Sequence, residues 1–159
     1  MNPKESYFRL QYDLVKKSRE ILLAFCTQIT ERDFLSENNS FGRGSMRNLL
    51  IHIANAYEFW IIQHALKRDV VFTEYSSKNT KDEIRTVFST IDIAVFDFIT
   101  LFESSALTPI DLKINGIKKQ TNALELFTHV ITHEFHHKGQ ILFLSRHLGY
   151  MPVDTDIIR

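Results

Sequence analysis

The spacing of apolar residues divides the chain into four long segments that we expect to be helices. Apolar side chains recur every three or four positions over residues 6–28, 45–66, 80–104 and 121–148, and charged residues such as Arg19 occupy the positions between them. This spacing is typical of an amphipathic helix that buries one face and exposes the other. Four such helices could share one core.

Residues that favour helix ends support these boundaries. Ser45 is a good N-cap for the second helix. Thr80 and Glu83 have the spacing of a capping box at the start of the third helix. Gly149 follows the fourth helix, where a glycine commonly takes the left-handed conformation that ends a helix.

A short β-hairpin is expected between the third and fourth helices. Apolar and polar residues alternate at the start of residues 110–120, and Asn115-Gly116 is the strongest short signal for a hairpin turn. Thr121 or Asn122 would then cap the fourth helix.

The remaining segments are expected to be irregular. Residues 30–44 have the composition of a loop, residues 70–79 that of a linker, and the final segment is expected to pack on the helices through Ile157 and Ile158. The sequence therefore predicts an all-α four-helix bundle with a small hairpin insertion, in one domain covering residues 1–159.

Charge and apolarity exclude two classes of partner. Nineteen basic and nineteen acidic residues give a formal net charge of zero, and no basic run suggests binding to nucleic acid. The longest apolar tract, residues 91–102, is too short to span a membrane. It is interrupted by Asp92 and Asp97, which we expect on the solvated face of the third helix.

The cysteine content and the N-terminal sequence predict a cytoplasmic protein. The single cysteine, Cys26, has no partner for an internal disulfide, and its apolar helical surroundings predict a buried, unreactive thiol. The first residues lack the apolar core of a signal peptide.

Histidines cluster on the fourth helix in a pattern that suits a metal ion. His129, His133 and His137 follow one another at intervals of four residues. His133 and His137 are separated by one helical turn and by about 40 degrees around the axis, which lets two nitrogens bind one ion. His129 lies a turn earlier and could be a ligand or a neighbour of the site, whereas His136 points outward.

A third ligand is expected from another helix. Bundles build metal sites from side chains on facing helices, and His52 lies at the border of the apolar stripe of the second helix. Taken alone, a histidine at this position is most often a core or boundary residue, but the cluster on the fourth helix favours a ligand. His64, at the end of the second helix, is expected at the surface. Three nitrogen ligands leave a coordination position open, as in catalytic zinc sites.

Residues 133–137 also spell the metalloprotease motif H-E-x-x-H, in which Glu134 would be the general base. The extended motif fails because Gln140 and Phe143 stand where it requires glycine and histidine. No glutamate follows His137 to act as a further ligand. The sequence therefore argues against a peptidase, and Glu134 could either reach the site or face solvent.

The chain resembles the DinB/YfiT-like proteins, a superfamily of four-helix-bundle proteins thought to be metalloenzymes. The resemblance rests on the segment 45–60, with His52 followed eight residues later by Trp60, and on the fourth helix and the residues after it. The matching residues there are His129-x-x-x-His133-Glu134-x-His136-His137-Lys138-Gly139-Gln140-Ile141, then Gly149-Tyr150 and Asp156-Ile157-Ile158.

This resemblance implies a metal triad of His52, His133 and His137, the residues that the spacing also favours. Zinc is the first expectation, and nickel, iron and manganese suit the same imidazole ligands. The resemblance also implies a cytoplasmic homodimer, in some relatives linked to stress or DNA damage, and an activity with low-molecular-weight thiols.

Our leading hypothesis is a metal-dependent enzyme that activates a small thiol, as in an S-transferase, or water, as in a hydrolase. His129 or Glu134 would assist as proton acceptors. The alternative is a non-catalytic bundle that the metal stabilises for binding a ligand or partner.

Overall fold

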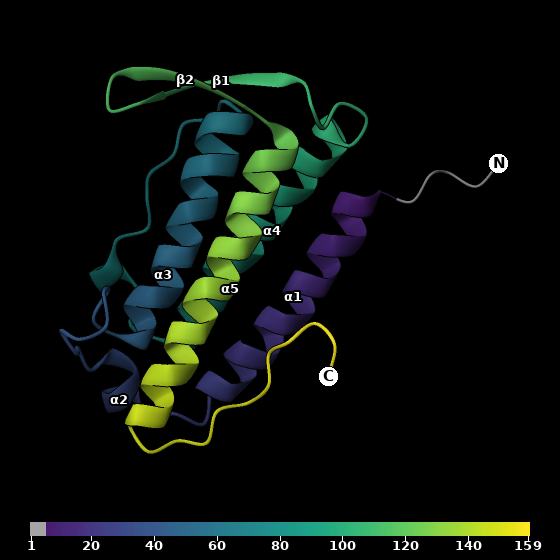
Figure 1. Cartoon of the computed structure of the whole chain (residues 1–159). Coiled ribbons are helices and arrows are strands. Elements are labelled where there is room, and N and C mark those ends of the chain that lie inside the picture. The colour runs from purple at the N-terminus through teal and green to yellow at the C-terminus, as the bar shows by residue number, and fades with distance from the viewer. Residues whose placement is uncertain (1–5) are drawn as a thin grey trace.

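Four long helices lie side by side in the computed structural model, which describes residues 6–159 (Figure 1). They are α1 (Tyr7–Cys26), α3 (Met46–Tyr57), α4 (Lys81–Phe102) and α5 (Ala123–His147). Both α3 and α1 pack against α4 and α5. The predicted all-α four-helix bundle is confirmed.

Three of the long helices begin at capping residues that the sequence indicated. The side chains of Ser45, Thr80 and Asn122 each accept a hydrogen bond from a backbone N–H in the first turn of their helix. Glu83 completes the capping box with Thr80. Such caps each contribute about 1 kcal/mol to helix stability. Gly149 has a φ of 92°, the left-handed conformation predicted for it.

The predicted hairpin is confirmed between α4 and α5. Strand β1 (Pro109–Ile114) pairs antiparallel with β2 (Ile117–Asn122). Asn115 and Gly116 form the turn, with φ values of 51° and 80° that glycine and asparagine tolerate best. The hairpin lies across one end of the bundle, where β1 contacts the extension of α3 and β2 contacts α5 (Figure 1).

The second predicted helix differs in its last third. After α3 the helix widens into a π-helix, η1 (Glu58–Ala65), in which the N–H of Leu66 donates to the carbonyl of Ile61 five residues earlier. The wider turn also brings the ring of His64 over the carbonyl of Phe59, with Nδ1 2.7 Å from the oxygen. His64 is therefore buried beneath the hairpin, and the prediction of a surface position was wrong.

Three further predictions need correction or extension. The segment 30–44 contains a short helix, α2 (Glu31–Leu35), and the linker contains one helical turn, η2 (Tyr75–Ser77). Ile157 and Ile158 are exposed. The final segment instead contacts the bundle where the carbonyl of Thr155 accepts a hydrogen bond from the Ser18 hydroxyl, at 2.6 Å.

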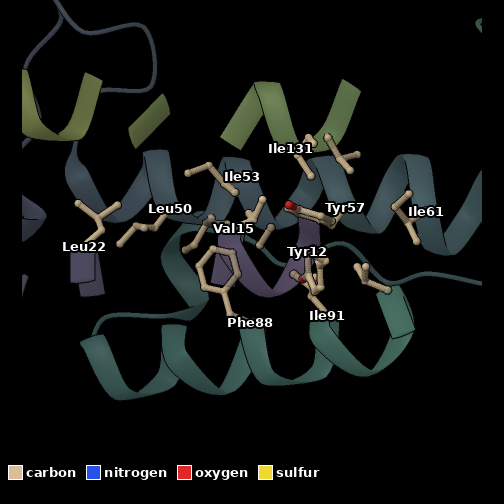
Figure 2. Packing of buried hydrophobic residues seen from close by; sticks show 14 of the residues in the cluster. Tyr12, Val15, Leu22, Leu50, Ile53, Tyr57, Ile61, Phe88, Ile91 and Ile131 are labelled. Atoms are coloured by element: carbon tan, nitrogen blue, oxygen red, sulfur yellow. The ribbon is translucent and has the colours of Figure 1, made fainter. Parts of the chain in front are cut away.

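The core lies between the four long helices, and each of them contributes to it. Figure 2 shows its middle, where apolar and aromatic side chains of α1, α3, α4 and α5 interdigitate. Cys26 is fully buried, as predicted, and burial raises its thiol pKa to about 12. Within residues 6–159, none of the helices combines the length and apolarity that a membrane crossing needs.

Candidate metal centre

Three histidines meet where α3 packs against α5. His52 comes from α3, and His133 and His137 come from successive turns of α5. Their ligand nitrogens all lie within 4.8 Å of one another. The structure therefore brings together the three residues that the sequence analysis chose as metal ligands.

The spacing of these nitrogens suits a single ion. Nε2 of His133 and Nε2 of His137 are 3.1 Å apart. Two imidazole nitrogens bound to one tetrahedral zinc ion at 2.0–2.1 Å would be roughly 3.3 Å apart. The pair is thus close to a coordination geometry, and a ring nitrogen of His52 lies within 4.8 Å of both.

The three imidazoles are held in the neutral form, which is the form that binds metal. Burial, together with the neighbouring Arg43 and His137, lowers the pKa of His52 to about 4. Burial and the neighbouring histidines lower the pKa of His133 to about 3. Burial also lowers the pKa of His137, and the hydrogen bond that His137 donates to Gln140 partly opposes this change.

Gln140 fixes the orientation of His137. Nδ1 of His137 lies 2.6 Å from Oε1 of Gln140, and an amide oxygen can only accept a hydrogen bond. Nδ1 therefore carries the proton, which leaves the Nε2 lone pair directed at His133. Gln140 also contacts His136, whose ring is exposed as predicted. Partners of this kind commonly tune a ligand's basicity. The sequence analysis missed this role, although the i, i+3 spacing of His137 and Gln140 is a signal for it.

Two buried polar atoms beside the histidines lack a partner among the described residues. They are Nδ1 of His133 and Oδ1 of Asn55. Both side chains line one pocket, together with His52. If Nε2 of His133 binds an ion, its Nδ1 carries a proton and needs an acceptor, and Asn55 offers an unused one.

His129 lies at the edge of the site. Its ring is exposed and packs edge-on against Trp60, with ring centroids 5.0 Å apart. The distance from its centroid to that of His133 is 5.9 Å. His129 is therefore a neighbour of the three histidines and not a member of their cluster.

Comparison with known proteins agrees with this arrangement. The sequence model of the DinB family matches residues 1–159. The chain belongs to the DinB family. YizA of Bacillus subtilis (strain 168), described as an uncharacterized protein, is 24% identical to it over 144 residues, which cover 88% of this chain and 87% of YizA. The DinB family is associated with metal binding, and the three histidines could form such a site.

Glu134 of this DinB-family chain faces away from the histidine cluster, into a buried group of charges. Its carboxylate receives two hydrogen bonds from Arg19, at 2.8 and 2.9 Å, and one from the Tyr57 hydroxyl at 2.6 Å. The Lys138 ammonium lies 2.9 Å away. Both carboxylate oxygens are occupied, so these contacts give no support to Glu134 as a proton acceptor for the site.

The same buried group corrects two predictions about the surface. Arg19 is 2% exposed and was predicted on the wet face of the first helix. Asp92 was predicted on the solvated face of the third helix, but it accepts hydrogen bonds from Arg19 at 2.8 Å and from Tyr12 at 2.7 Å. Arg19 is buried and Asp92 is half-buried, because opposite charges from other helices neutralise them. Asp97 is exposed and pairs with Arg68, as expected for a solvated residue.

The balance of charges keeps Glu134 ionised. Burial alone would raise the pKa of its carboxyl, but Arg19 and Lys138 lower it to about 2. Burial lowers the pKa of Lys138, and Glu134 opposes that change. The cluster of Arg19, Glu134, Lys138 and Asp92, called here the ion cluster, carries two formal charges of each sign.

Proposed function

We propose that this DinB-family chain is a metal-dependent enzyme in which His52, His133 and His137 hold a divalent ion that activates a small thiol or water. The observation that carries the proposal is the convergence of three neutral imidazoles within 4.8 Å, without a fourth histidine, cysteine or carboxylate in the group among the described residues. Three protein ligands leave a position for substrate.

The residues around the three histidines have distinct tasks in this proposal. An ion bound there would lower the pKa of a thiol or water ligand, which makes it nucleophilic near neutral pH. Gln140 keeps the lone pair of His137 directed at the ion. His129, which is exposed, would accept the released proton and pass it to solvent.

We favour thiol transfer over hydrolysis because of the resemblance to thiol-dependent relatives. In such a reaction the sulfur forms a bond to carbon, and the leaving group departs with the electron pair of the bond that breaks. Zinc is the first choice of metal, with nickel, iron and manganese as alternatives. On the same grounds we propose a cytoplasmic homodimer.

Metal analysis tests the proposal directly. The protein, purified without a metal-affinity tag, should contain about one equivalent of a divalent transition metal. His52→Ala, His133→Ala and His137→Ala should each lose most of it. His147→Ala is the matched control, because His147 is an exposed histidine at the far end of α5 and should leave the metal content unchanged.

A chemical assay then separates the two candidate roles. Metal-loaded protein would be mixed with 1-chloro-2,4-dinitrobenzene and each of a panel of thiols. In the reaction the thiol sulfur forms a bond to the ring carbon and chloride leaves. Turnover that is lost in His133→Ala supports an enzyme. If the protein holds stoichiometric metal but shows neither thiol transfer nor hydrolysis of 1-chloro-2,4-dinitrobenzene, the result supports the non-catalytic bundle. A wild-type protein without metal contradicts both the enzyme and the metal-stabilised bundle.

A further inference from the structure

A small pocket adjoins the candidate metal centre. It is open to solvent, has a volume of about 260 Å³ and includes His52 and His133 in its wall. The rest of its lining is largely aromatic, with Phe59, Trp60 and Phe72. The pocket is therefore continuous with the place where the proposed ion and its substrate would meet.

One face of the second long helix builds most of this pocket. Asn55, Phe59 and Trp60 follow His52 by three, seven and eight residues. This is the spacing of side chains on one face of a helix. The rings of Phe59 and Trp60 are in edge-on contact, with centroids 4.8 Å apart. Phe72 comes from the segment after η1, and its ring centroid lies 6.3 Å from that of Phe59.

These aromatic residues are not simply part of the core. Phe59 and Trp60 are half-buried, and Phe72 is 39% exposed. A ligand could therefore enter from solvent and bury the exposed parts of the rings, which is favourable because apolar surface leaves water.

The size and chemistry of the pocket select a class of ligand. A cavity of about 150 Å³ lined by apolar side chains holds a benzene molecule, so 260 Å³ accommodates a six-membered ring and a short substituent. Aromatic walls favour a flat apolar group through offset or edge-on contacts.

We propose that this pocket binds a flat, ring-sized apolar group of the substrate, one or two bonds away from the sulfur or oxygen that is directed at His52 and His133. The substrate class is thus a small aralkyl thiol or its oxygen analogue. This inference rests on the proposed function for the direction of the sulfur, whereas the ring binding depends on the pocket alone.

Trp60 makes the proposal measurable, because it is the single tryptophan of the chain. The zinc-loaded protein would be titrated with benzyl mercaptan and with 2-mercaptoethanol while Trp60 fluorescence is recorded. Benzyl mercaptan should bind at least about tenfold more tightly, since only its ring can fill the aromatic pocket.

A pair of matched variants tests whether Phe72 provides the preference for benzyl mercaptan over 2-mercaptoethanol. Phe72→Ala should reduce the affinity for benzyl mercaptan by about tenfold and leave the affinity for 2-mercaptoethanol and the zinc content unchanged. Phe143→Ala removes another exposed phenylalanine, 63% exposed and outside this pocket, and should change neither affinity. Circular dichroism checks that both variants are folded.

Titration of the metal-free protein with benzyl alcohol separates this inference from the proposed function. Binding that weakens in Phe72→Ala supports the pocket, even if the protein proves to hold no metal. A protein that binds zinc stoichiometrically but binds both thiols equally well overturns the pocket and leaves the metal centre standing. An equal loss of affinity for benzyl mercaptan in Phe72→Ala and Phe143→Ala also overturns the proposed role of the pocket.

Discussion

Neighbouring residues of α5 point to different sides of the helix. His133 and His137 meet His52, whereas Glu134 and Lys138 meet Arg19 in the ion cluster. The reason is that consecutive residues of a helix are about 100 degrees apart around its axis. A substitution at Glu134 should therefore act first on the stability of the bundle.

We expect Glu134→Gln to lower the free energy of unfolding by roughly 3–5 kcal/mol, because it leaves the buried ammonium of Lys138 without a counter-charge and Arg19 with Asp92 alone. Urea denaturation followed by circular dichroism measures the change. Asp97→Asn is the control, since it breaks an exposed ion pair and should cost less than about 1 kcal/mol. Similar losses in both variants would show that the ion cluster adds no special stability.

The pH dependence of stability provides a second test of Glu134. Its pKa is lowered from 4.5 to about 2 in the folded protein, so the ionised carboxyl favours folding. The contribution is complete above the unfolded pKa of 4.5 and is lost as the pH falls towards 2. The difference in stability between wild type and Glu134→Gln should therefore narrow over that range. A difference that stays constant would mean that another group is responsible.

The residues of the site could be predicted only where helix geometry fixes them. His133 and His137 have a known angular relation once α5 is recognised, and a facing helix supplies His52. The ion cluster could not be predicted, because Arg19 and Asp92 look like surface residues on separate helices. Their burial depends on how α1 and α4 turn towards Glu134, which the sequence of each helix alone does not show.

Two glycines of the last element differ in backbone conformation and should respond differently to substitution. Gly139 lies inside α5, and Gly149 follows its end with a φ of 92°. An added Cβ meets nothing within 4 Å at either position. Gly139→Ala should therefore stabilise the protein by about 0.5–1 kcal/mol, as expected for alanine in a helix. Gly149→Ala should cost about 1–2 kcal/mol because of its left-handed conformation.

Urea denaturation of the two variants measures both effects on the same scale. Changes of the same sign would show that packing, and not backbone conformation, controls these positions. Zinc content should stay constant in both variants, since neither glycine belongs to the three-histidine cluster.

The helices and the hairpin were predictable because each has a long periodic pattern or a specific end signal. The capping box of Thr80 and Glu83 and the turn at Asn115-Gly116 are examples. The short helix α2 has too few residues to show a period, and η1 has the same apolar spacing as an α-helix. Its widening depends on packing, so the sequence pattern does not reveal it.

At the scale of the whole molecule, metal binding should stabilise the bundle by linking α3 to α5. A ligand that binds only the folded protein, at a hundredfold excess over its Kd, adds about 2.7 kcal/mol. For a chain of 159 residues this should raise Tm by roughly 5–10 °C. Differential scanning calorimetry with and without zinc measures the shift.

His133→Ala should show almost no such shift, whereas His147→Ala should behave like wild type. A shift of equal size in all three proteins would indicate that zinc binds elsewhere. The chelator EDTA, added to the zinc-loaded wild type, should return Tm to the value of the metal-free protein.

The π-helix η1 has a consequence for how this chain should be aligned with its relatives. In η1 the hydrogen bonds span five residues in place of four, so the helix accommodates one additional residue over this segment. A relative with an ordinary α-helix in this place would need one residue fewer between His52 and the hairpin. Single-residue gaps in an alignment of the family should therefore gather within Glu58–Ala65, and variation in the number of residues there should leave the three histidines in register.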